Sequence, residues 1–244
     1  MDGPNVATWF EDHYFDVPRQ IIEFLGGDGI TLADHVVADI GCGDGLITLG
    51  IHDAARPARI VGFDVEPMDP HALAAVAREH GLEEPCPSTF EFRQSTATRL
   101  PADDGVFDFA VSWSMFEHVS HPEEMAREIH RILAPHGVAM IQLYPFYDSE
   151  HGDHSWDSAP FRHLVTGTDD PAPGSFPLNR INLDELQAAF LAAGLRVTKV
   201  ELIHHAFQLP PELAARPLSS LSIAGVKLLM ARDDGIGATG VATA

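Results

Sequence analysis

Short apolar runs alternate with segments of helical periodicity along most of this chain. Segments with apolar residues three and four positions apart predict helices at 45–55, 70–82, 121–137 and 182–194, and a further helical segment, 5–26, precedes the first strand. Seven runs rich in β-branched and aromatic residues predict strands, at 36–40, 58–64, 90–94, 106–114, 138–146, 195–203 and 225–232.

The order of these elements indicates the fold class. Strands that alternate with helices form βαβ units, so we expect an α/β fold with a doubly wound, mostly parallel sheet of seven strands. The last two strands have no predicted helix between them, and we expect them to pair antiparallel at the sheet edge. No internal repeat or second domain is visible, which predicts one domain over 1–232.

One connection is much longer than the others. The residues between the fifth strand and the next helix, about 145–181, are rich in Pro, Asp, His and Gly. A connection of that length inside a compact domain is usually functional, so we expect an inserted cap. The final residues, 233–244, have the composition of a disordered tail.

Acidic residues outnumber basic ones by 36 to 15, for a formal net charge of −21. An acidic surface repels phosphate backbones, so we expect no nucleic-acid partner, although solubility alone also explains the charge. No apolar run reaches the length of a membrane span, and the N-terminus does not resemble a signal peptide. The two cysteines, Cys42 and Cys86, lie too far apart for a metal or redox motif. We therefore expect a cytoplasmic protein without a membrane partner.

Three glycines follow the first predicted strand in the stretch VVADIGCGDG. Gly41, Gly43 and Gly45 let the chain turn sharply and bring a ligand against bare backbone at a helix N-terminus. The loop lacks the G-x-G-x-x-G spacing of dinucleotide-binding folds, and its acids, Asp39 and Asp44, disfavour a pyrophosphate. A ligand with an ammonium group and a sulfonium centre suits this charge, which favours S-adenosylmethionine over NAD.

A longer series of motifs supports the same cofactor. Asp64 ends the second predicted strand, where an acidic side chain accepts hydrogen bonds from ribose hydroxyls. The segments VADIGCGDG, GFDVEP, FDFAVSWSMFEHV and RILAPHGVAMIQ resemble, in order and spacing, the motifs of class I S-adenosylmethionine-dependent methyltransferases acting on small molecules. The resemblance runs from about residue 19 to residue 232. It implies a Rossmann-like methyltransferase fold with S-adenosylmethionine as cofactor.

The resemblance also implies a set of cofactor-binding residues. The glycine loop would hold the methionine moiety, Asp64 the ribose with Glu66 as a second candidate, and the backbone at Ser112 the amino-acid end. Thr96 stands where the family often has an acid that binds the adenine amino group, so only backbone contacts are expected there. The full set is Asp39, Gly41, Cys42, Gly43, Gly45, Asp64, Val65, Thr96, Ala97 and Ser112.

The acceptor is expected between the fourth strand and the cap. His118, in the motif SMFEHV, would lie near the transferred methyl group and serve as a catalytic base, together with His154 of the cap. A structural role for His118 is the alternative, because methyltransferases with different acceptors share this motif. For the aromatic residues of the N-terminal segment the alternative is ordinary packing, which is typical of aromatic residues at helical spacing. The residues expected to bind the substrate are Tyr14, from the N-terminal helical segment, and Tyr144, His151 and His163.

The histidines of the cap raise the question of a metal ion. His151 and His154, with Asp153 between them, offer ligands that suit several divalent ions. With 14 histidines in the chain, however, such a cluster arises readily by chance, and nothing in the pattern fixes three ligands on rigid elements. We therefore predict no metal site.

These observations predict methyl transfer to an oxygen, either hydroxyl or carboxyl, of a small molecule. The cap segments GDH and PFRHL resemble methyltransferases of natural-product and surface-saccharide pathways, which suggests the kind of metabolite. Alternatives are N- or C-methylation, with or without a metal ion, and more distantly a dinucleotide-dependent oxidoreductase or a cofactor-binding protein without catalysis. We expect a monomer or a homodimer.

Overall fold

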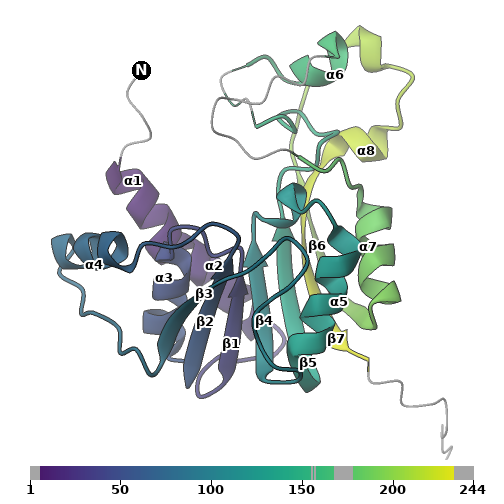
Figure 1. The fold of residues 1–244 in the computed structure, drawn as a ribbon. Coiled ribbons are helices and arrows are strands. Elements are labelled where there is room, and N and C mark those ends of the chain that lie inside the picture. The colour runs from purple at the N-terminus through teal and green to yellow at the C-terminus, as the bar shows by residue number, and fades with distance from the viewer. Residues whose placement is uncertain (1–5, 155, 157, 168–177, 234–244) are drawn as a thin grey trace, which may run out of the picture.

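The computed structural model describes residues 6–154, 156, 158–167 and 178–233 of the chain. Its centre is a seven-stranded sheet in the order β3-β2-β1-β4-β5-β7-β6 (Figure 1). The first five strands in the chain are parallel, whereas β7 pairs antiparallel with both β5 and β6. The α/β class and the mostly parallel sheet are thus confirmed. The strands are β1 (Val36–Ile40), β2 (Arg59–Asp64), β3 (Phe90–Gln94), β4 (Phe107–Trp113), β5 (Leu133–Leu143), β6 (Leu195–His204) and β7 (Ile223–Arg232).

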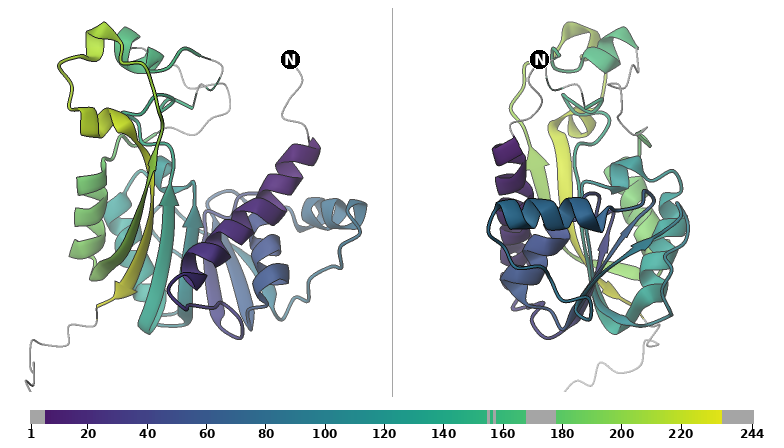
Figure 2. Two further views of the ribbon diagram at one scale, coloured as in Figure 1. Left: turned by 180° about the vertical axis from the view of Figure 1, so that it is seen from behind. Right: turned by 60° about the vertical axis from the view of Figure 1, so that its left-hand side comes forward.

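Helices cover both faces of the sheet. In chain order they are α1 (Val6–Phe10), a π-helical segment (Glu11–Asp16), α2 (Val17–Gly26), α3 (Leu46–Ala55), α4 (Pro70–Glu79), α5 (Pro122–Ile132), α6 (Arg162–Thr166), α7 (Leu183–Ala192) and α8 (Leu218–Ser222), with 3-10 turns at Phe116–His118 and Pro211–Leu213. The N-terminal helices and α3 lie on one face, and α5 and α7 on the other (Figure 2). None of the described helices combines the length and the apolarity that crossing a bilayer requires.

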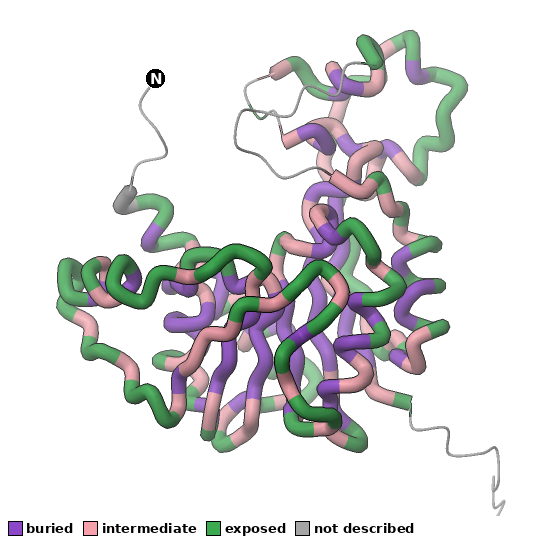
Figure 3. The backbone as a smooth tube through the Cα atoms, viewed as in Figure 1, coloured by how far each residue is buried: buried purple, intermediate pink, exposed green. Residues whose placement is uncertain are grey.

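The core consists of two apolar layers separated by the sheet. On one face α5 buries Met125, Ile129 and Ile132. On the other face the N-terminal helices bury Ile21 and Leu25 among other side chains. The central strands β1, β2, β4 and β5 lie between these layers and are mostly buried, as Figure 3 shows, which explains their apolar runs in the sequence. The edge strands β3 and β6 are more exposed. Each buried aliphatic side chain contributes about 1.5–3 kcal/mol to folding.

Local signals place the helix ends. The Asn182 side chain accepts from the Glu185 N–H at 2.9 Å while Glu185 accepts from the Asn182 N–H at 3.1 Å, a capping box that begins α7. Gly194 follows that helix in the left-handed conformation, at φ +83°. Helix α5 ends at Ile132, earlier than the predicted limit of 137, because Pro135 disfavours helical backbone at the residue before it.

A cap extends beyond the carboxyl end of β5 and is built from two separate segments (Figure 1). The first follows β5 and contains α6, and the second, residues 205–222, joins β6 to β7 and contains α8. The sequence predicts a cap over about 145–181 alone. Residues 155, 157 and 168–177 of that range lie outside the described residues, as do residues 234–244 of the expected tail. The two segments meet in an apolar cluster of Phe161, Leu213 and Leu221, with Leu164 and Phe207 beside it.

Candidate active site

The glycine loop connects β1 to α3, and its three glycines have positive φ angles. Gly41, Gly43 and Gly45 lie at φ +79°, +53° and +84°, where residues with a Cβ are strained. A Cβ on Gly41 would stand 2.2 Å from Cγ of Met115, and one on Gly45 would stand 2.6 Å from Cζ of Phe92. A Cβ on Gly43 would meet nothing within 4 Å. Two of the glycines are therefore required by packing, whereas the space beside Cα of Gly43 is open to a ligand.

Asp64 ends β2 beside this loop. Its Oδ2 accepts a hydrogen bond from the Gly43 N–H at 2.8 Å, and its Oδ1 accepts from the Glu66 N–H at 2.9 Å. Each carboxylate oxygen has a second lone pair, so the half-buried side chain still has capacity to accept from a ligand's hydroxyl groups. The next residue, Val65, is exposed, and its carbonyl accepts from Nε2 of Gln94 at 3.0 Å.

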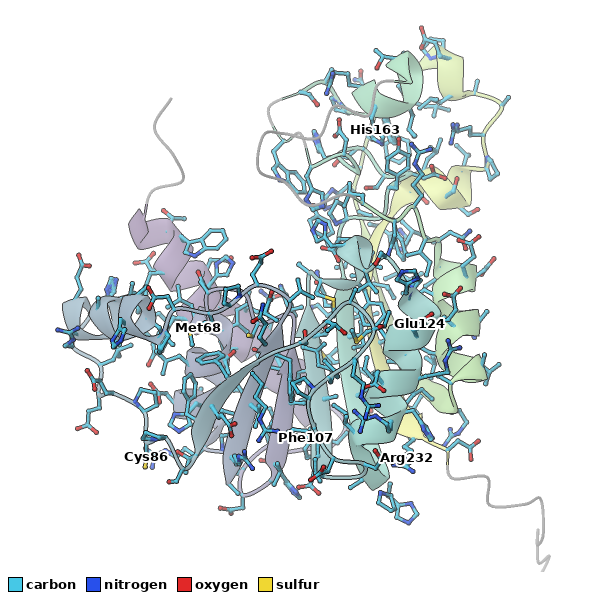
Figure 4. All side chains as sticks on the ribbon, in the orientation of Figure 1. Met68, Cys86, Phe107, Glu124, His163 and Arg232 are labelled. Atoms are coloured by element: carbon cyan, nitrogen blue, oxygen red, sulfur yellow. The ribbon has the colours of Figure 1, made fainter. Side chains whose placement is uncertain are left out.

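Asp39 lies below the loop rather than on its surface. Its side chain is buried and accepts from Oγ1 of Thr48, on α3, at 2.6 Å. Burial raises the pKa of Asp39 to about 7, and burial also raises the pKa of the neighbouring Cys42 thiol. The other cysteine, Cys86, is exposed far from the cap (Figure 4).

The N-terminal helix reaches the glycine loop through one side-chain contact that sequence reasoning missed. Nε1 of Trp9 donates to Oδ2 of Asp44 at 2.9 Å, while Oδ1 of Asp44 accepts from the Leu46 N–H at 3.0 Å. Tyr14 lies further along: its hydroxyl donates to Asp53, in the second half of α3, at 2.7 Å. The structure therefore places Tyr14 against the flank of α3 and not beside the histidines of the cap.

Thr96 and Ala97 follow β3, the strand next to Asp64 in the sheet. Thr96 forms a short bridge to Arg99, with its N–H donating to the Arg99 carbonyl at 3.0 Å. Both residues are exposed at the carboxyl end of β3, on the side of Asp64 away from the glycine loop. This place is compatible with the backbone contacts to adenine that the family resemblance implies.

The end of β4 brings the next segment over the glycine loop. Ser112 is buried, and its Oγ meets no hydrogen-bond partner in the part of the chain that the structure describes. Ser114 turns the chain at φ +48°, with its N–H and its hydroxyl donating to Oε1 of Gln142 at 2.8 and 3.0 Å. This change of direction at Ser114 brings Met115 against Gly41. The 3-10 turn Phe116–His118 follows directly.

Glu117 and His118, on that turn, meet His154 of the cap. One ligand atom from each of the three side chains lies within 4.8 Å of the other two, and the rings of His118 and His154 are 5.0 Å apart at 85°. Burial raises the pKa of Glu117 to about 8, and burial, followed by the nearby His118, lowers the pKa of His154 to about 4. The structure thus brings the two predicted catalytic histidines together and adds Glu117. Its position directly before His118 in the sequence was the available signal.

Asn179 holds this turn in place from the far end of the cap segment. Its Nδ2 donates to the carbonyl of Phe116 at 2.6 Å and to that of Val119 at 2.8 Å, and its N–H donates to the carbonyl of Glu117 at 2.8 Å. Three hydrogen bonds from one residue therefore fix the backbone that carries Glu117 and His118.

The other predicted residues of the cap separate into two groups. Tyr144 stacks on Trp156 with ring centroids 5.8 Å apart, and His151 contacts the same indole at 5.5 Å. His154 also stacks on Trp156, at 6.0 Å, so these side chains surround one half-exposed indole. His163, by contrast, is buried inside the cap (Figure 4), with Nε2 placed 2.7 Å from the Tyr147 carbonyl. That contact gives His163 a place in the interior of the cap instead of on an open surface.

Comparison with known proteins supports one class of enzyme. A family model described as a methyltransferase domain matches residues 38–141. The ubiquinone biosynthesis O-methyltransferase of Pseudomonas paraeruginosa is 36% identical over 111 residues, which cover 45% of this chain and 44% of the relative. The chain therefore matches less than half the length of this relative.

Solved structures show the same fold over a longer range. An S-adenosylmethionine-dependent methyltransferase from Mesorhizobium loti has a TM-score of 0.60 at 18% identity, covering 86% of this chain and 96% of the other. One from Methanosarcina mazei has a TM-score of 0.59 at 17% identity, covering 85% and 96%. Together, the solved structures show that the chain has the fold of S-adenosylmethionine-dependent methyltransferases, and the family model identifies a methyltransferase domain over residues 38–141.

Proposed function

We propose that this protein transfers the methyl group of S-adenosylmethionine to an oxygen of a small-molecule acceptor. The observation that carries the proposal is the hydrogen bond from the Gly43 N–H to Asp64 at 2.8 Å, beside the open space at Gly43 and at the carboxyl edge of the sheet. In open α/β sheets, ligands bind outside the carboxyl ends of the strands where the strand order reverses. Here the order reverses between β1 and β4, directly at the glycine loop.

The cofactor would lie along this edge. Its ribose hydroxyls would bond to Asp64, its adenine would approach the exposed Thr96 and Ala97, and its methionine end would approach the loop and the backbone at Ser112. The charges support this assignment, because Asp44 and Asp64 favour a cationic ammonium and sulfonium over a diphosphate.

The acceptor would bind between the glycine loop and the cap. Alignment of a nucleophile with the activated methyl carbon supplies much of the rate, and a hydroxyl acceptor also has to lose its proton. The polar side chains gathered at this place are Glu117, His118 and His154. The indole of Trp156, on which His154 stacks, offers an apolar surface for the carbon skeleton of the acceptor. The names of the O-methyltransferase relatives favour oxygen over nitrogen or carbon as the acceptor atom.

A methyl-transfer assay tests the proposal. The protein would be incubated with S-adenosylmethionine labelled in the methyl group and with panels of phenols, hydroxy acids, sugars, amines and activated carbon acids. We expect label to move to hydroxyl or carboxyl compounds. Transfer to amines or carbon acids alone would contradict O-methylation. Tight cofactor binding with no transfer to any panel would instead indicate a cofactor-binding protein without catalysis.

A further inference from the structure

The cluster of Glu117, His118 and His154 joins two elements that are far apart in the chain. Glu117 and His118 come from the turn after β4, which three hydrogen bonds from Asn179 hold in place, and His154 comes from the cap. His154 has the left-handed backbone conformation, at φ +58°. A residue other than glycine rarely adopts that conformation, and such strain is concentrated at functional sites.

Among the described residues, Glu117 has a buried carboxyl group that no neighbour satisfies by a hydrogen bond. The residue is only 3% exposed, and within the described ranges neither carboxyl oxygen has a hydrogen-bond partner. Nε2 of His154 is likewise buried without a hydrogen-bond partner there. A buried polar group without a partner costs about 1–3 kcal/mol, and an ion that binds there is one explanation for its presence.

From this geometry we infer that Glu117, His118 and His154 bind a divalent ion of the first transition series. Ligand atoms bound at about 2.0–2.2 Å from one ion stand roughly 3–4 Å from each other. The three ligand atoms here lie within 4.8 Å of one another, so a small inward movement would place them on a common ion. Two imidazoles and one carboxylate suit zinc, iron, cobalt or manganese, whereas magnesium and calcium prefer oxygen ligands throughout.

The place of the site suggests what the ion does. Met115, two residues before Glu117, packs against Gly41 of the glycine loop, so the ion would lie close to the methionine end of the cofactor. Three protein ligands leave positions open for an acceptor with two adjacent oxygens, such as a vicinal diol, a catechol or a hydroxy acid.

This role rests on the proposed methyl transfer and specifies its acceptor. The ion would lower the pKa of a bound hydroxyl, which then loses its proton to water. The resulting oxygen anion forms a bond to the methyl carbon, and the carbon–sulfur bond breaks with its electron pair going to sulfur. The products are a methyl ether and S-adenosylhomocysteine.

Titration of the chelator-treated protein with Co²⁺ and with Zn²⁺ tests the site directly, without any acceptor. Cobalt binding is followed by visible absorption and zinc binding by calorimetry. We expect one ion per chain, and a loss of affinity of at least about a hundredfold in Glu117→Gln and in His154→Asn. Asparagine is chosen at 154 because it tolerates the left-handed conformation. The matched control is His151→Asn, three residues earlier in the same cap segment, which should bind both ions as the wild type does.

Absence of saturable binding would overturn the inference, and so would variants at Glu117 and His154 that bind like the wild type. An equal loss in the His151→Asn control would do the same. Thermal unfolding of each metal-free variant shows whether it folds, and His154→Asn keeps the test decisive if Glu117→Gln does not. Affinity for S-adenosylhomocysteine, measured in parallel, separates the two proposals: ion binding without cofactor binding would contradict the methyl transfer and leave the ion site standing.

Discussion

Asp39 shows how a single buried acid links the cofactor loop to stability. Its carboxyl group is enclosed under the loop and accepts from Thr48 at 2.6 Å. Burial raises its pKa from 3.8 to about 7. In the cofactor-free protein the folded state therefore keeps this proton up to about pH 7, whereas the unfolded chain releases it near pH 4. Stability is higher below that window and falls as pH rises through it.

We predict that replacing Asp39 by Asn removes this dependence. Between pH 5 and pH 8 the free energy of unfolding of the wild type should fall relative to that of Asp39→Asn, by an amount on the order of 2–4 kcal/mol. Urea denaturation of both proteins at several pH values measures the difference. Parallel pH profiles for the two proteins would show that Asp39 ionises normally in the folded state.

Other single residues show what the sequence reveals and what it hides. The glycines of the loop and Asp64 were predictable because a strand, a turn and an acid follow one another locally. The contact of Trp9 with Asp44 spans 35 positions, and no local pattern reports it. Glu117 lies directly before His118 in the sequence, but its burial without a hydrogen-bond partner among the described residues is a property of the surrounding fold, which the letters FEH do not record.

At the scale of elements, the turn Phe116–His118 depends on a residue more than 60 positions away. Asn179 donates to the carbonyls of Phe116 and Val119, separations of 63 and 60 residues. Met115, directly before this turn, packs on Gly41. The cap segment that carries Asn179 is therefore linked to the glycine loop through the turn and Met115.

We predict that Asn179→Ala lowers both stability and cofactor affinity. The variant loses the two hydrogen bonds from Nδ2 to the carbonyls of the turn and the one that Oδ1 accepts from the Ile181 N–H, which together should cost about 1–3 kcal/mol in the free energy of unfolding. Loosening the turn should also weaken S-adenosylhomocysteine binding. The matched control is Asn182→Ala, which removes the cap of α7 and should cost about 1 kcal/mol without changing that affinity. Urea denaturation and calorimetry measure the two quantities. Equal cofactor affinities in the two variants would contradict the connection.

The elements themselves were more predictable than their assembly. Parallel strands buried on both faces give continuous apolar runs. The capping box of Asn182 and Glu185 lies within four residues of the sequence, and the antiparallel pairing of β6 with β7 joins two strands that are consecutive in the chain. The second cap segment, 205–222, was not predicted as part of the cap because it is rich in proline and short on regular structure. It acquires its structure by packing Leu213 and Leu221 against Phe161, which is a tertiary contact.

At the scale of the whole molecule, fold and charge point to the same cofactor. The doubly wound sheet gathers the ends of β1, β2 and β4 at one edge, and a net charge of −21 gives an acidic environment for a sulfonium cofactor. The fold alone does not decide the reaction, because one architecture hosts many chemistries. The expected exclusion of nucleic acid and the expected monomer or homodimer stay predictions.

The central claim is that Asp64 and the glycine loop bind the cofactor, and calorimetric titration with S-adenosylhomocysteine tests it most directly. We predict binding of about micromolar affinity in the wild type and no heat with NADH. In Asp64→Ala the affinity should fall by about 1–3 kcal/mol, because the ribose hydroxyls lose a charged acceptor, while Asp64→Asn should lose less. Unchanged affinity in a folded Asp64→Ala protein, or binding of NADH in place of S-adenosylhomocysteine, would contradict this account.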